Sequence, residues 1–103
     1  MNIEEMKTKI AEDVKANPVV LFMKGSKEFP QCGFSARVVQ ILNAHNADYV
    51  TRDVLSDPLL RDAIKQFSDW PTLPQLYING EFIGGCDIVT EMAERDELQP
   101  LLK

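Results

Sequence analysis

The stretch VVLFMKGSKEFPQCGFS, residues 19–35, decides the fold of this chain. Its first five residues form a continuous apolar run of strand length, which is typical of a strand buried on both faces of a sheet. A loop with Gly25 and Pro30 follows, and Cys32 stands just before a helical pattern. The stretch therefore predicts a strand, a loop and a helix, with a thiol at the turn into the helix.

Hydrophobic periodicity predicts four helices in the chain. The first spans the apolar residues from Ile3 to Val14, and the second runs from the turn at Cys32 to about His45. The third begins at Ser56-Asp57-Pro58, and the last follows Cys86-Asp87. The apolar faces of the second and the last helix are expected to hold, respectively, Phe34, Val38, Ile41 and Leu42, and Ile88, Val89, Met92 and Leu98.

Three further strands are expected at residues 49–54, 75–78 and 81–83. Asn79-Gly80 joins the last two as a hairpin, because a type I′ turn needs positive φ at both central residues. The helix between the first two strands favours a parallel pair with a right-handed crossover. We therefore predict an α/β fold with a four-stranded mixed sheet, helices on both of its faces, and a single domain over residues 1–103. Cys32 falls beyond the carboxyl end of a strand, where such sheets bind ligands.

Composition narrows the class of protein. The 103 residues carry a net charge of −5, which argues against non-specific binding to nucleic acid or to an anionic membrane. The two cysteines do not resemble the disulfide framework of a secreted domain, and no His/Cys spacing indicates a zinc site. No apolar run approaches the roughly 20 residues that span a bilayer, and the acidic start MNIEE resembles neither a signal nor a transit peptide. We expect a cytoplasmic protein.

Cys32 is the candidate reactive residue. Backbone N–H groups and the dipole at a helix N-terminus favour negative charge, so the pKa of this thiol should be depressed. The thiolate is the form that attacks sulfur or binds metal. Ser35 occupies the position of the second cysteine of a C-x-x-C motif, so Cys32 cannot resolve its own mixed disulfide locally. The alternative is a buried structural cysteine.

Four separated blocks carry a resemblance to a known family. Lys24, the tetrad CGFS at residues 32–35, WPTLPQ at residues 70–75 and GGCD at residues 84–87 resemble the monothiol glutaredoxins of the CGFS type, most of all their single-domain bacterial form. The resemblance runs nearly end to end, with the spacing between blocks intact. It implies a thioredoxin-like fold and bound glutathione. Lys27 departs from the family loop, which often has proline there, and is expected to add charge near the site and loosen the loop.

The resemblance also implies roles for single residues. Lys24 and Arg61 would bind the glycine carboxylate of glutathione, although each could be an ordinary surface cation. Leu73 would pair its backbone with the cysteinyl part of the tripeptide, next to a cis bond with Pro74. Trp70 is expected to be a partly buried packing residue rather than a ring at the site.

The start of the last helix would hold the other end of glutathione. Gly84 and Gly85 would let the backbone approach the ligand closely, and Cys86 would contact it through its backbone. The γ-glutamyl carboxylate would meet the helix N–H groups. Asp87 would bind the ammonium group, or act as an N-cap, or do both. Cys86 could be a small filler or a second reactive thiol, and the sequence leaves both open.

These features leave three functions open. One thiolate of Cys32 and one of glutathione per chain, doubled in a homodimer, supply the four ligands of a [2Fe–2S] cluster. The resemblance then implies a cluster carrier that acts in iron–sulfur assembly, with a BolA-type protein and recipient proteins as partners. The alternative is glutathione-dependent thiol–disulfide exchange, which removes glutathione from mixed disulfides through Cys32 alone and is generally weak in the resembling family. A third possibility is a regulatory interaction module in which the thiol is incidental.

Overall fold

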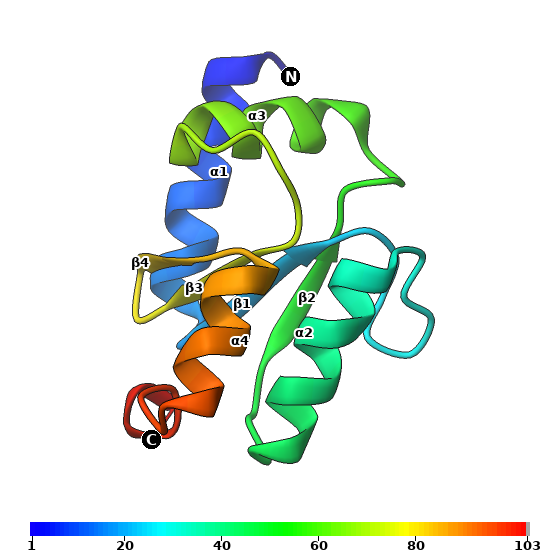
Figure 1. Cartoon of the computed structure of the whole chain (residues 1–103). Helices are drawn as coiled ribbons and strands as arrows, with labels where there is room; N and C mark the ends of the chain where they lie inside the picture. Colours follow the sequence, from blue (N-terminus) through cyan, green and yellow to red (C-terminus); the bar gives the residue numbers. More distant parts are fainter. Residues whose placement is uncertain (103) are drawn as a thin grey trace.

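The computed structural model describes residues 1–102 (Figure 1). The α-helices are α1 (Ile3–Ala16), α2 (Gly33–Ala44), α3 (Pro58–Ser68) and α4 (Cys86–Glu94). The strands are β1 (Val19–Met23), β2 (Val50–Asp53), β3 (Gln75–Ile78) and β4 (Glu81–Gly84), and a short 3-10 helix, η1, covers Gln99–Leu102. No helix among the described residues is long and apolar enough to cross a membrane.

The four strands form one mixed sheet in the order β2-β1-β3-β4. β1 pairs with β2 in parallel, whereas β3 is antiparallel to both β1 and β4. α1 and α3 cover one face of the sheet, and α2 and α4 cover the other (Figure 1). The predicted architecture is therefore confirmed, including the parallel pair and the hairpin.

Local signals explain where several elements begin and end. The Asn2 side chain accepts a hydrogen bond from the Glu5 N–H, and the Glu5 carboxylate accepts one from the Asn2 N–H, so a capping box starts α1. Asp57 caps α3 ahead of its first residue, Pro58. The hairpin turn places Asn79 at φ 52° and Gly80 at φ 83°, as a type I′ turn requires.

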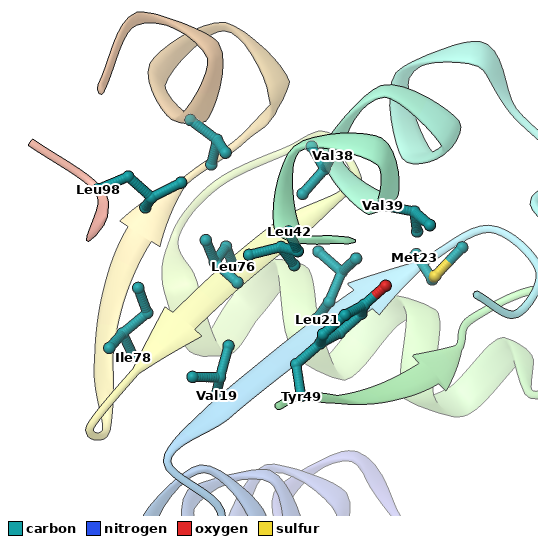
Figure 2. Close-up of a cluster of buried hydrophobic side chains, with 11 residues drawn as sticks. Val19, Leu21, Met23, Val38, Val39, Leu42, Tyr49, Leu76, Ile78 and Leu98 are labelled. Atoms are coloured by element: carbon teal, nitrogen blue, oxygen red, sulfur yellow. The ribbon is translucent and has the colours of Figure 1, made fainter. Parts of the chain in front are cut away.

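β1 separates two hydrophobic cores. Alternate side chains of a strand point to opposite faces, so Val20 and Phe22 pack toward α1 and α3. The other β1 side chains pack toward α2 and α4, together with Val38 and Leu42 of α2 and Leu76 of β3 (Figure 2). All five residues of β1 are buried, which confirms the prediction from the apolar run. The strand that leads to Cys32 is thus fixed from both sides.

Three details of the sequence prediction were wrong. β2 is shorter than the predicted strand 49–54. Phe34 is 62% exposed, because it lies in the first turn of α2, at the open edge of the sheet rather than over the core. α4 stops at Glu94, since Asp96 adopts a left-handed φ of 58° that breaks the helix. Leu98 is nevertheless buried, in the core against α2 and α4, from the turn that follows the helix.

Candidate functional site

Cys32 is the N-cap residue of α2. Its backbone is extended, with φ −151° and ψ 138°, and the thiol is half-buried. No acidic residue occupies the first turn of α2, so no neighbouring carboxylate there competes for the positive end of the helix dipole. The prediction of a thiol at a strand-to-helix turn is confirmed, and the alternative of a buried structural cysteine does not hold.

The environment of Cys32 favours the thiolate. The backbone N–H of Ser35 is the main reason that the pKa of the Cys32 thiol is lowered, and it outweighs the opposing effect of partial burial. The Phe34 N–H, the charge of Lys24 and the Ser35 hydroxyl lower this pKa further. The first turn of α2 therefore stabilises the thiolate mainly through its own backbone, as expected for a helix N-terminus.

Part-buried hydrogen bonds hold the loop that leads to Cys32. The hydroxyl of Ser35, which is fully buried, accepts a hydrogen bond from the Lys24 N–H at 3.1 Å. Asp53, at the end of β2, accepts another from the Gly25 N–H at 3.0 Å. The Gln31 N–H donates to the Lys24 carbonyl at 2.8 Å, which closes the loop on itself. The start of the loop is thus tied to α2 and to β2, and the residue before Cys32 is tied to that start.

Lys27 does not act as the sequence suggested. Its ammonium group donates a hydrogen bond to the Tyr49 carbonyl at 2.8 Å and lies 4.5 Å from the centre of the Tyr49 ring. Lys27 neither lines the cleft described below nor contributes to the pKa of Cys32. The expectation of a loosened loop with added charge at the site is therefore wrong, because this lysine attaches the loop tip to the chain just before β2.

A cleft of about 520 Å³ opens beside Cys32. Its lining comes from the residue that follows β1, from α2, α3 and α4, and from the segment before β3. The predicted site residues in its lining are Lys24, Cys32, Arg61, Leu73, Pro74, Cys86 and Asp87. The peptide bond between Leu73 and Pro74 is cis, as the resemblance implied. Residues far apart in the sequence thus come together around one thiol.

The structure corrects one expectation at the start of α4 and leaves another as a prediction. Gly85 is the N-cap of α4 beside the cleft, and its contact with glutathione stays a prediction. A Cβ at Gly85 would meet the Pro74 carbonyl at 3.3 Å. The small size of Gly85 serves the close packing of α4 against the Pro74 segment. Asp87 is not the N-cap, because it lies in the first turn of the helix and makes no capping hydrogen bond. Its exposed carboxylate is left free to face the cleft.

The cleft also contains residues that the sequence analysis did not assign. Lys65 adds a third cation next to Lys24 and Arg61. Residues four apart share a face of a helix, so the spacing of Arg61 and Lys65 could have revealed it. Thr72 and Phe34 complete the lining together with Pro71. Phe34 was placed in the core because its spacing fits the apolar face of α2. Trp70, as predicted, packs instead, with its ring 6.0 Å from that of Phe82.

Cys86 shares the cleft with Cys32. Both cysteines are free and half-buried, and the Cys86 sulfur lies 4.0 Å from the Thr90 hydroxyl. Cys86 also packs against the core between the sheet, α2 and α4. Cys86 therefore both fills space in the core and lines the cleft. Its position is compatible with a packing role and with a second reactive thiol.

A second groove of about 520 Å³ lies on the other face of the sheet, between α1 and α3. Its charged lining includes Asp13 and Arg52, which pair with each other at 2.8 Å, and it contains no cysteine. Residues 1–102 contain no group of three or more His, Cys, Asp or Glu side chains that could hold a metal ion. The cleft at Cys32 is thus the place where this chain can perform thiol chemistry.

The sheet has this topology, the thiol at its first strand-to-helix turn has a lowered pKa, and a cis-proline lines the same cleft. These features together define a thioredoxin-like protein with a reactive thiol. Residues 19–83 match the glutaredoxin family. The chain belongs to that family, and its relatives are monothiol glutaredoxins. It is 56% identical over 94 residues to the "Probable monothiol glutaredoxin 2" of Rickettsia typhi, covering 91% of this chain and 85% of that protein.

Solved structures agree with this assignment. The solution structure of reduced poplar apo GrxS14 matches with a TM-score of 0.81 and 54% identity, over 92% of this chain and 87% of that one. The crystal structure of a buckwheat glutaredoxin–glutathione complex matches with a TM-score of 0.86 and 29% identity, over 97% and 89% of the two chains. The predicted thioredoxin-like fold is confirmed.

Proposed function

We propose that this chain is a single-domain monothiol glutaredoxin of the CGFS type. In this proposal it binds glutathione in the cleft and holds a [2Fe–2S] cluster across a homodimer, for assembly and transfer of iron–sulfur clusters. The observation that carries the proposal is one cleft that unites a single low-pKa thiol, Cys32, with a group of cations and with a carboxylate. Each of these groups matches a part of glutathione.

Charge complementarity supports glutathione as the ligand. The tripeptide has a carboxylate at its glycine end, and an ammonium group and a second carboxylate at its γ-glutamyl end. Lys24, Arg61 and Lys65 offer cations to a carboxylate, and Asp87 offers an anion to the ammonium group. The first N–H groups of α4 receive no side-chain cap and suit the remaining carboxylate. The family resemblance assigns the contacts of Lys24, Arg61, Asp87 and the helix N–H groups, and Lys65 is added by the lining of the cleft.

The sulfur donors of the chain fit a shared cluster. A [2Fe–2S] cluster needs four ligands, and Cys32 offers one thiolate per chain. Two chains and two glutathione thiolates complete the set, so Cys32 would ligate iron and the cleft would hold the glutathione whose sulfur completes the site. When bound, the cluster would supply a transferable iron–sulfur group. Lys24, Arg61 and Asp87 would orient glutathione, and the α2 N-terminus would keep Cys32 ionised.

The wider role is proposed on the same basis. A cluster held partly by a dissociable ligand suits transfer to recipient proteins, with a BolA-type protein as a further partner. We propose the cytoplasm as its compartment, in line with the composition of the chain.

Glutathione-dependent reconstitution tests the proposal. The apo protein is incubated with iron, sulfide and a reductant, with or without glutathione, and visible absorption is recorded. A brown species that forms only with glutathione supports cluster binding. A colourless protein that rapidly removes glutathione from a mixed disulfide would instead favour the alternative function, in which Cys32 attacks and free glutathione resolves.

A further inference from the structure

Gln75, the first residue of β3, is the one fully buried amide side chain of residues 1–102. Its exposed fraction is 0%, and every hydrogen-bonding group of its side chain has a partner. The amide nitrogen donates to the Trp70 carbonyl and to the Thr72 carbonyl, both at 3.2 Å. The amide oxygen accepts from the Tyr77 hydroxyl at 3.1 Å. Burying an amide side chain costs free energy unless all of its polar groups are hydrogen-bonded. The partners of Gln75 therefore show which part of the structure this side chain holds in place.

The two carbonyls belong to the segment that forms one wall of the cleft. Thr72 and Leu73 both line the cleft, and they share one peptide unit. That peptide unit is trans, and the C=O and N–H of a planar trans peptide point in opposite directions. Because Gln75 holds the Thr72 carbonyl toward the interior, the Leu73 N–H points the other way, toward the cleft. Within residues 1–102 the Leu73 N–H donates no hydrogen bond.

The far side of Gln75 is anchored in the core. Tyr77 is 2% exposed, and its ring packs against Phe22, Phe67 and Phe82 at centroid distances of 5.6, 6.0 and 5.3 Å. Burial raises the pKa of Tyr77 to about 12, so its hydroxyl stays a hydrogen-bond donor. Gln75 and Tyr77 are two apart on β3 and therefore share a face of the sheet. The Thr72 carbonyl is thus linked through Gln75 to the rigid centre of the core formed with α1 and α3.

We propose that Gln75 is a positioning residue for ligand binding: it fixes the Thr72–Leu73 peptide so that the Leu73 N–H is presented to the backbone of the cysteinyl residue of glutathione. This inference rests on the proposed function for the identity of the ligand. The orientation of the Leu73 amide, by contrast, is a property of the protein without ligand. Gln75 touches no ligand itself and acts through Thr72 and Leu73.

Two variants separate positioning from stability. Gln75→Met keeps the approximate volume and removes both donors to the loop carbonyls. Tyr77→Phe is the matched control, because it removes a buried hydrogen bond of the same network and leaves both donors in place. Glutathione affinity is measured by calorimetry with the whole apo protein, and the Leu73 amide is followed by NMR without ligand. We expect Gln75→Met to weaken glutathione binding roughly tenfold and to shift the Leu73 signal. Tyr77→Phe should stay within about twofold in affinity.

Two results overturn the proposal. The first is a Gln75→Met protein that binds glutathione within about twofold of the unaltered protein. The second is an equal loss in Tyr77→Phe, which would tie the effect to stability. If the unaltered protein binds no glutathione, the proposed function fails, and the Leu73 signal alone then decides the orientation assigned here.

A third variant covers the case in which Gln75→Met does not fold. Gln75→Glu keeps an acceptor for Tyr77, and its carboxyl can donate to a loop carbonyl only when it is protonated. Its glutathione Kd, divided by that of the unaltered protein at the same pH, should therefore fall as the pH is lowered. A ratio that does not change with pH contradicts the positioning role.

Discussion

Lys27 lies over the ring of Tyr49, with its ammonium group 4.5 Å from the ring centre and 2.8 Å from the Tyr49 carbonyl oxygen. The contact joins the tip of the loop before Cys32 to the residue that precedes β2. Lys27 thus restrains the loop by a side-chain contact. Monothiol glutaredoxins of the CGFS type often have a proline at this position, whose ring restrains the backbone.

The first prediction concerns this contact. Lys27→Met should lower the free energy of unfolding by about 1 kcal/mol, because it removes a charge-assisted hydrogen bond and a cation–π contact that are partly exposed to water. Urea unfolding measures the change. Lys15→Met, which alters an exposed lysine of α1, is the control and should change stability by a few tenths of a kcal/mol at most. Equal stability of the two variants would show that the contact contributes nothing.

The second prediction concerns the pKa of Cys32. Because this pKa is lowered, the rate of alkylation by iodoacetamide should reach half its maximum at a lower pH than for an ordinary cysteine thiol. Lys24→Gln should move that midpoint upward only in part, since the Ser35 and Phe34 N–H groups remain. Lys27→Gln removes a loop charge that does not act on Cys32, so its midpoint should not move. If the alkylation midpoint of Lys24→Gln rose all the way to that of an ordinary cysteine thiol, the leading role of the backbone N–H groups would be contradicted.

The third prediction separates the two cysteines. Cys32→Ser should form no cluster under reconstitution while retaining its fold, because iron prefers a thiolate and the turn accommodates a hydroxyl. Cys86→Ser should still form a glutathione-dependent cluster. Visible absorption reports the cluster, and far-ultraviolet circular dichroism reports the fold. Loss of the cluster in Cys86→Ser would indicate that two cysteines of each chain, rather than glutathione, supply the sulfurs.

Arg61 provides the fourth prediction, because a missing ligand contact and a missing iron ligand respond differently to glutathione concentration. Arg61→Ala should raise the glutathione midpoint of cluster assembly about tenfold, since a charge-assisted hydrogen bond contributes roughly 1.5 kcal/mol or more. Excess glutathione should restore assembly in Arg61→Ala and should not restore it in Cys32→Ser. Lys15→Ala removes the same charge far from the cleft and is the control. A midpoint unchanged from that of the unaltered protein would make Arg61 a surface residue.

The sequence predicted the elements well where local chemistry decides them. The apolar run of β1, the Asp57 cap and the Asn79-Gly80 turn each act within a few residues, and all three are present. Leu98 could not be assigned in this way. It fits the period of α4 but reaches the core from a turn, because a left-handed residue had already ended the helix.

The site shows the same limit. Residues carried by the four motif blocks meet in one cleft, because the topology brings the ends of β1, α3 and the Pro74 segment together. Contacts that no local sequence pattern signals were missed or wrongly predicted. Lys27 binds Tyr49 across 22 residues of chain. Gln75 holds carbonyls of a loop that the sequence shows only as a run between prolines.

The most direct test of the central claim is native mass spectrometry of the reconstituted protein. The claim is that Cys32 and a glutathione bound in the cleft jointly ligate a cluster shared by two chains. The account predicts a mass equal to two chains, two glutathione molecules and one [2Fe–2S] cluster, and a monomer for the apo protein. A cluster-loaded monomer, or a cluster-loaded dimer without glutathione, would contradict it.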